Sequence, residues 1–194
     1  MTGESKRQIE HMLFVGFAFL LRYLSVAQAA LCGLAAVAYS LFGSPRLNKA
    51  GVREDEVARG YSPGKLSYAL AVLALILIFR DNMHITAGAW AAMALGDGAS
   101  NLTGRAWGRK KLPWSKHKTW VGTATFFLVS WAGAFLLVVW TALGRGIELP
   151  ETGTVVAVCA GASAFSALVE SLPLRLDDNI TSTAAAAVVL AVFL

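Results

Sequence analysis

The polar stretch at residues 95–123 carries the side chains that chemistry on phosphate groups requires. If the apolar helix before it continues through residue 108, a turn of about 100° per residue places four small or polar residues on one stripe. These residues are Asp97, Asn101, Gly104 and Gly108, and Arg105 lies at the margin of the stripe. A carboxylate can hold Mg²⁺, a guanidinium can bind phosphate oxygens, and glycines let phosphates approach the backbone. The alternative is a frayed helix end whose charges only mark a membrane interface.

A second group of cations and small residues follows in the same stretch, before the next apolar run. It consists of Lys111, Lys116, Lys118, Thr119 and Gly122. Pro113 ends the preceding segment, and Ser115 is one acceptable N-cap of the following helix. Lys116, Lys118 and Thr119 would then occupy its first turn, where free N–H groups and the helix dipole favour anions. A Walker A loop is excluded because its glycines are absent before Lys118, whereas ordinary positive flanking of a span remains an alternative.

Acidic side chains form a third group, near the C-terminal end of the sequence. Glu170 lies near the end of an apolar run, where an ionisable side chain is costly and therefore indicates a function. Asp177, Asp178 and Asn179 precede the last apolar run. One of them is sufficient as a helix N-cap, so three in a row predict an additional role such as holding a metal ion.

The elements that must position these residues are membrane helices. The chain has 194 residues, of which 56% are hydrophobic and 15% charged, and its mean hydropathy is +0.58. A soluble domain of this length carries more charge, and several apolar runs reach the roughly 20 residues that a helix needs to cross a bilayer. The runs are continuous and rich in Ala and Leu, which argues against the alternating pattern of a β-barrel. The sequence therefore predicts an all-α integral membrane protein.

Seven apolar segments are expected, in one polytopic domain that covers residues 1–194. They run roughly over 9–24, 26–42, 65–79, 83–96, 120–143, 153–172 and 180–194. The fourth and seventh are short for full spans and are expected to be tilted, half-inserted or extended by polar turns. The first imitates a secretory signal, but the apolar residues after Ala30 favour an uncleaved span. Cys32 and Cys159 match no metal-ligand spacing and are expected to be small buried hydrophobes.

The distribution of positive charge predicts which loops share a face of the membrane. Seven crossings place the N-terminus and the loops near 43–64, 97–119 and 173–179 on one side. Of the 17 lysines and arginines, only Arg22, Arg80 and Arg145 fall on the other side. This asymmetry indicates that the three candidate groups are cytoplasmic. Loop cations beside anionic lipid headgroups also account for the pI near 9.5, so no nucleic-acid partner is needed.

Together the motifs resemble the CTP-dependent polyprenol kinase family, which includes phytol, farnesol and dolichol kinases. The main match reads Gly96-Asp97-Gly98-Ala99, Gly104-Arg105, Gly108, Lys111-Leu112-Pro113, Lys116, Lys118-Thr119 and Gly122-Thr123. Two further matches read Glu170-Ser171-Leu172-Pro173 with Asp177-Asp178-Asn179-Ile180-Thr181, and Arg59-Gly60 with Gly64 and Tyr68. The resemblance extends over about residues 7–181 and is strongest to phytol kinases. Arg7 and His11 share one side of the first helix. In the family a lysine often follows this arginine, whereas Gln8 stands there in this sequence. Arg7, His11 and His117 receive no role.

The resemblance implies transfer of the γ-phosphate of CTP to an isoprenoid alcohol at the cytoplasmic membrane surface. Such catalysis consists mainly of positioning and charge neutralisation. Asp97 or Glu170 would orient or deprotonate the attacking hydroxyl. The expected Mg²⁺ ligands are Asp97, Asp177, Asp178 and Asn179. The expected nucleotide-binding residues are Asn101, Gly104, Arg105, Gly108, Lys111, Lys116, Lys118, Thr119 and Gly122.

Two other functions are compatible with parts of this pattern. A cytidylyltransferase that makes a CDP-lipid carries a similar run, but Val121 stands here where that run has a glutamate. A transporter or non-catalytic scaffold is the second alternative, although a transporter needs charges near the middle of its spans. The sequence does not decide which alcohol or nucleotide is used, or between a monomer and a homo-oligomer.

Overall fold

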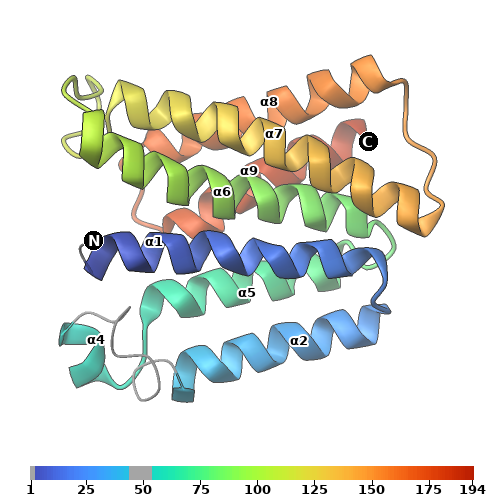
Figure 1. Cartoon of the computed structure of the whole chain (residues 1–194), viewed down its shortest axis with the longest axis horizontal. Coiled ribbons are helices and arrows are strands. Elements are labelled where there is room, and N and C mark those ends of the chain that lie inside the picture. Colours follow the sequence, from blue (N-terminus) through green and yellow to red (C-terminus); the bar gives the residue numbers. More distant parts are fainter. Residues whose placement is uncertain (1–2, 44–53) are drawn as a thin grey trace.

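The computed structural model describes residues 3–43 and 54–194, and in these ranges the chain is a bundle of helices along one long axis (Figure 1). Helix α1 (Gly3–Leu13) continues as the 3₁₀ helix η1 (Phe14–Arg22), and α2 (Val26–Ala38) ends in the π-helical turn η2 (Tyr39–Gly43). A short helix, α4 (Glu54–Arg59), precedes α5 (Pro63–Ile78). The long helices follow, namely α6 (Met83–Trp107), α7 (Trp120–Arg145), α8 (Thr152–Ser171) and α9 (Asp178–Phe193).

All seven expected apolar segments coincide with helices, and the short helix α4 was not expected. The fourth segment does not end at residue 96 but continues to Trp107, as the stripe of polar residues requires. Within the expected loop at 43–64, residues 44–53 lie outside the described ranges. The described residues form no sheet, and an isolated bridge pairs Lys111 with Thr119.

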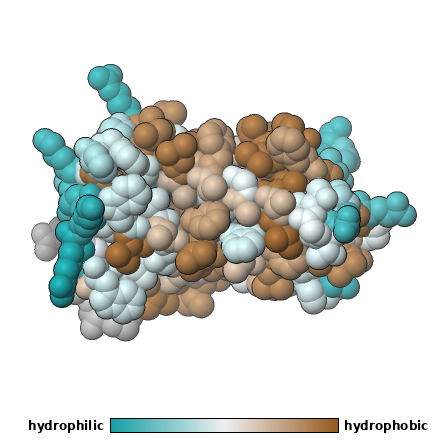
Figure 2. Space-filling view, turned by 90° about the horizontal axis from the view of Figure 1, so that it is seen from above, coloured by the Kyte–Doolittle hydropathy of each residue, from teal (hydrophilic) through white to brown (hydrophobic). Residues whose placement is uncertain are grey.

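Within residues 3–43 and 54–194, three helical segments are long and apolar enough to cross a bilayer, and they are Val26–Gly43, Trp120–Arg145 and Thr152–Ser171. At 1.5 Å per residue, α7 is about 39 Å long and α8 about 30 Å, so each is long enough to cross a hydrocarbon core of about 30 Å. Figure 2 shows hydrophobic residues over the middle of one face and hydrophilic residues at both ends. This distribution is typical of a membrane protein, while the seven crossings and the cytoplasmic face stay predictions.

Helix α6 lies at the centre, because its small residues let neighbouring helices approach closely on several sides. It packs against α7, α9 and the α1–η1 segment, and every side chain from Met83 to Ala94 is buried. At Gly96, a Cβ atom would lie 2.1 Å from Ser130 Oγ, whose hydroxyl donates to the Ala92 carbonyl at 2.7 Å. Small residues are common where membrane helices pack this closely. The central helix therefore carries Asp97 into the interior of the bundle.

Helices α2 and α5 pack against each other at the edge of the bundle farthest from α7 and α8 (Figure 1). The end of η1 is instead tied to α7, since Arg145 donates to the carbonyls of Leu21 and Leu24 and the Arg22 guanidinium lies 4.3 Å from the Trp140 ring centroid. The expectation of two buried cysteines is wrong for Cys32, which is exposed, whereas Cys159 is buried. An apolar residue in a membrane bundle can face lipid as well as core, so hydropathy alone did not separate the two.

Candidate active site at the polar end of a cavity

The stripe of polar residues on α6 forms as its spacing predicted. Asn101 lies one turn after Asp97, and its Nδ2 donates to Asp97 Oδ1 at 2.8 Å and to the Asp97 carbonyl at 3.0 Å. The amide therefore holds the carboxylate in one orientation while leaving its second oxygen, Oδ2, for another partner. Both residues line the same cavity.

The predicted cap of the following helix is wrong. Helix α7 begins at Trp120, and its N-cap is Thr119, whose Oγ1 accepts from the Gly122 N–H at 3.1 Å. Ser115 Oγ instead accepts from the Lys118 N–H at 3.2 Å within the loop. The bridge between Lys111 and Thr119 closes the intervening residues into a loop of turns, so the helix cannot begin before Thr119. Lys118 therefore precedes α7 and projects from a loop rather than from the first helical turn.

The glycines of the predicted phosphate site pack the end of α6 against the start of α7. A Cβ atom on Gly104 or Gly122 would lie 3.1 Å from Thr119 Oγ1. At Gly108, a Cβ atom would lie 2.2 Å from the Gly104 carbonyl oxygen and 2.5 Å from Thr119 Oγ1. The absence of side chains here allows Thr119 to sit between the two helices, and a direct contact of these glycines with nucleotide stays a prediction.

This packing leads to the first testable prediction, for Gly108→Ala. The added methyl group has no space beside backbone and Thr119, so the loop must shift, and we expect a loss of about 1–3 kcal/mol in the free energy of unfolding. Thermal unfolding in detergent measures this loss. Gly153→Ala is the control, because no heavy atom of the described residues lies within 4 Å of a Cβ atom there. Equal stability of the two variants would contradict the packing role.

Lys118 connects the loop to both acidic groups. Its ammonium is hydrogen-bonded to Glu170 Oε1 and lies 2.9 Å from Asp178 Oδ2. Burial alone would lower the pKa of this ammonium, but the charges of Glu170 and Asp178 outweigh burial and hold the pKa above its ordinary value. Glu170 itself is buried at the end of α8, where an unpaired carboxylate would be costly. The three residues form a charged bridge between the α6–α7 loop, α8 and α9.

The acidic residues at 177–179 have separate local roles. Asp177 is the N-cap of α9, and its Oδ1 accepts from the Asn179 N–H at 3.0 Å and from Ser67 Oγ at 2.8 Å. Asn179 Nδ2 donates to the Gly64 carbonyl at 3.2 Å. These bonds join the start of α9 to the start of α5. Asp178 faces Lys118 instead, so the three residues provide more than a cap.

The first helix contributes residues to which the sequence assigned no role. His11 Nε2 lies 3.9 Å from Asp97 Oδ2, and the His11 ring meets the Tyr68 ring edge-on at 4.4 Å between centroids. Within the described part of the chain, this nitrogen is buried without a hydrogen-bond partner. Glu10 pairs with Lys65 Nζ at 3.0 Å. The spacing of Glu10 and His11 alone did not indicate a role, since their partners lie on α5 and α6.

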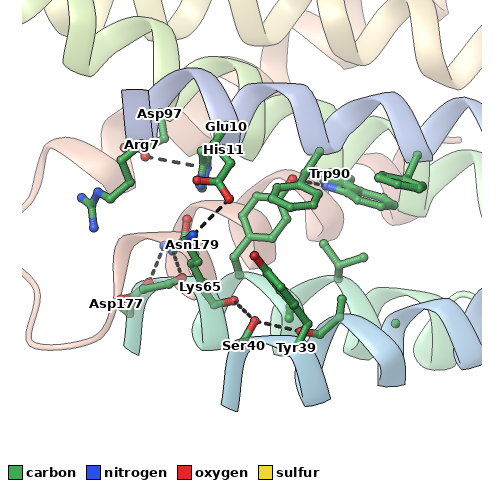
Figure 3. A pocket seen from close by; sticks show the side chains of 18 of the residues that line it. Arg7, Glu10, His11, Tyr39, Ser40, Lys65, Trp90, Asp97, Asp177 and Asn179 are labelled. Carbon is green, nitrogen blue, oxygen red and sulfur yellow. Dashed lines mark hydrogen bonds and ion pairs between the residues drawn. The ribbon is translucent and has the colours of Figure 1, made fainter. Parts of the chain in front are cut away.

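These elements surround one cavity of about 930 Å³ (Figure 3). Six of the predicted site residues line it, namely Asp97, Asn101, Lys118, Asp177, Asp178 and Asn179. Charged residues of the N-terminal half also line it, namely Arg7, Glu10, His11, Glu56, Arg59 and Lys65. Of the predicted residues that the structure describes, eight do not line it, and they are Gly104, Arg105, Gly108, Lys111, Lys116, Thr119, Gly122 and Glu170. Arg105, Lys111 and Lys116 are exposed.

The donor set suits a magnesium ion shared with a phosphate ligand rather than one enclosed by protein. Among residues 3–43 and 54–194, no group of three or more His, Cys, Asp or Glu side chains is arranged to hold a metal ion by itself. Mg²⁺ ordinarily binds through one or two carboxylates, with water and substrate phosphates completing its octahedron. Asp97, Asp177 and Asp178 supply such carboxylates at the cavity wall.

Sequence comparison finds relatives among plant kinases. The chain is 32% identical over 165 residues to "Phytol kinase 1, chloroplastic" of Arabidopsis thaliana, covering 82% of this chain and 53% of that protein. It is 34% identical over 124 residues to "Probable phytol kinase 1, chloroplastic" of Glycine max, covering 61% and 39%. It is 28% identical over 120 residues to "Farnesol kinase, chloroplastic" of Arabidopsis thaliana, covering 61% and 38%.

The chain spans about half the length, or less, of these curated relatives. No protein-family model matches it, and no solved structure does. The matches to proteins named phytol kinase and farnesol kinase agree with the resemblance drawn from the motifs around Asp97, Glu170 and Asp177. On this basis, the chain belongs to a phytol kinase- and farnesol kinase-like family.

Proposed function

We propose that the chain is a kinase that transfers the γ-phosphate of CTP to the hydroxyl of an isoprenoid alcohol. The observation that carries this proposal is the cavity, in which charged residues around Asp97 and Lys118 continue into an apolar wall. A water-soluble triphosphate and an amphipathic alcohol need these two environments side by side. The names of the relatives support the alcohol and the kinase activity, and the motif resemblance supports CTP as donor.

In the proposed reaction, the hydroxyl oxygen forms a bond to the γ-phosphorus, and the bond from this phosphorus to the β–γ bridging oxygen breaks. CDP leaves, and the hydroxyl proton passes to the Asp97 carboxylate. Asp97 is preferred over Glu170 for this step because Asp97 lines the cavity, whereas Glu170 accepts a hydrogen bond from the Lys118 ammonium. His11, 3.9 Å from Asp97 Oδ2, would orient that carboxylate in turn.

The remaining residues would neutralise phosphate charge. Lys118 is the predicted phosphate ligand best placed at the cavity. Of the expected metal ligands, Asp177 and Asp178 would hold magnesium, which leaves Asp97 to take the proton. The metal would supply charge neutralisation on the triphosphate, as in other phosphoryl transfers. On the predicted topology, this end of the cavity opens at the cytoplasmic face.

The test is transfer from CTP labelled at either the α or the γ phosphorus, with purified protein, Mg²⁺ and geranylgeraniol. We expect label in the lipid product only from the γ position, and slower transfer from ATP, GTP and UTP. Label from the α position would instead favour a cytidylyltransferase, which is assayed in parallel with phosphatidate. No transfer from any nucleotide to prenols or phosphatidate would favour a transporter or scaffold.

A further inference from the structure

The cavity extends well beyond its charged end as an apolar groove. Its walls are formed by η1, α2 and α5, with Trp90 of α6 on one side. Ser40 and Lys65 line the charged end, whereas Ala29 and Ile76 line the far end. Ala29 and Ser40 lie eleven positions apart on the α2–η2 segment, so the groove follows this segment for about 16 Å at 1.5 Å per residue.

One side of the groove is open. Phe17 and Leu20 of η1 line it and are 54% and 44% exposed, and Cys32 of α2 lines it and is exposed as well. The opening follows from the packing, because η1 is fixed to α7 through Arg145 whereas α2 packs on α5. In a bilayer, apolar residues exposed along the middle of a helix face lipid tails. A ligand can therefore enter this groove sideways from the membrane.

We infer that the groove holds the isoprenoid chain of the alcohol, and that the side chain at position 32 limits how long this chain can be. The inference rests on the proposed function, because the hydroxyl must reach Asp97 while the tail leaves along α2. An apolar tail fits the apolar wall, and the charged mouth excludes a ligand that is apolar at both ends. The whole cavity has the volume of a small-ligand site, so its apolar part has room for a prenol tail of several isoprene units beside the charged end.

Cys32 lies toward the far end of the groove, eight residues from Ser40 and three from Ala29, which is about 12 Å along the helix from the charged end. Cys32→Phe should block the far end of the groove, because the new ring extends into a space that the thiol leaves open. We expect kcat/KM for geranylgeraniol, with four isoprene units, to fall at least tenfold. With geraniol, which has two, we expect a change within twofold.

Leu34→Phe is the matched control. Leu34 is on the same helix and is 53% exposed, and it does not belong to the described residues that line the cavity. We expect it to leave kcat/KM for both alcohols unchanged. An equal fall with both alcohols in Cys32→Phe, or no fall with either, would overturn the inference.

Occupancy of the groove can be measured without catalysis. Cys32 is exposed and Cys159 buried, so N-ethylmaleimide should modify Cys32 selectively in detergent-solubilised protein, as read by mass spectrometry. We expect geranylgeraniol to slow this modification at least threefold, and geraniol to slow it less. The inference fails if geranylgeraniol gives no protection at concentrations that saturate transfer, even though the proposed function then stands. If geranylgeraniol protects Cys32 but no nucleotide supports phosphate transfer, the groove is confirmed and the kinase activity is refuted.

Discussion

Asp97→Asn is expected to reduce phosphate transfer by about 10²–10⁴-fold, the range that positioned proton transfer ordinarily contributes. Asparagine keeps the shape of aspartate and retains an oxygen that accepts the hydrogen bond from Asn101 Nδ2, which is 2.8 Å in the native chain. It removes the carboxylate that would accept the hydroxyl proton. The fold should therefore survive while the chemistry is lost.

The measurement is kcat with saturating CTP and geranylgeraniol, together with thermal unfolding in the same detergent. Asp81→Asn is the matched control, because Asp81 is exposed and pairs with Arg80 at the opposite end of α6. We expect that variant to keep full activity. Turnover of Asp97→Asn within threefold of the native chain would remove Asp97 from the reaction.

Lys118→Met is the second substitution with a large expected effect, and it should affect both stability and activity. The variant leaves Glu170 buried without its partner, and removing one partner of a buried ion pair costs about 3–5 kcal/mol. It also removes a charged donor from the cavity. A hydrogen bond to a charged group contributes about 1.5–3 kcal/mol, so kcat/KM for CTP should fall by roughly 10–100-fold.

A second substitution separates the two effects. In Lys118→Met with Glu170→Gln, the buried carboxylate is replaced by a neutral amide, so most of the lost stability should return. The activity should not return, because the ammonium group that binds the phosphate oxygens is still missing. Lys110→Met is the control for charge alone, since Lys110 is exposed in the same loop. Recovery of transfer in the double variant would show that Lys118 acts only by holding Glu170.

Local periodicity was sufficient to predict part of the site. The pairing of Asp97 with Asn101 follows from four-residue spacing on one helix. Most helix ends lie close to those of the apolar runs, but α6 continues through polar residues to Trp107. Local sequence was less reliable at the start of α7, where Ser115 and Thr119 are both acceptable caps. The pairing of Lys111 with Thr119 decided between them, and a cap preference contains no information about such a bridge.

The site residues come from distant parts of the sequence, and this limits how far their contacts can be predicted from the sequence. Lys118 pairs with Glu170 across 52 positions, and Ser67 bonds Asp177 across 110 positions. Which residues meet at such separations depends on how several helices pack, and each of these helices has more than one apolar face. The sequence therefore did not distinguish Lys118, inside the cavity, from the exposed Lys116.

By itself, the sequence determined the helical class, the approximate helix ends, the residue types for phosphate chemistry and the family resemblance. These depend on composition, on the helical repeat and on short motifs, all of which are local properties of the chain. Only the tertiary structure decided that Arg7, His11 and Lys65 join the acidic residues, that three glycines pack around Thr119, and that an apolar groove leads away from Asp97. The reason is physical, because a cavity is what remains after all helices have packed, and no single segment encodes it.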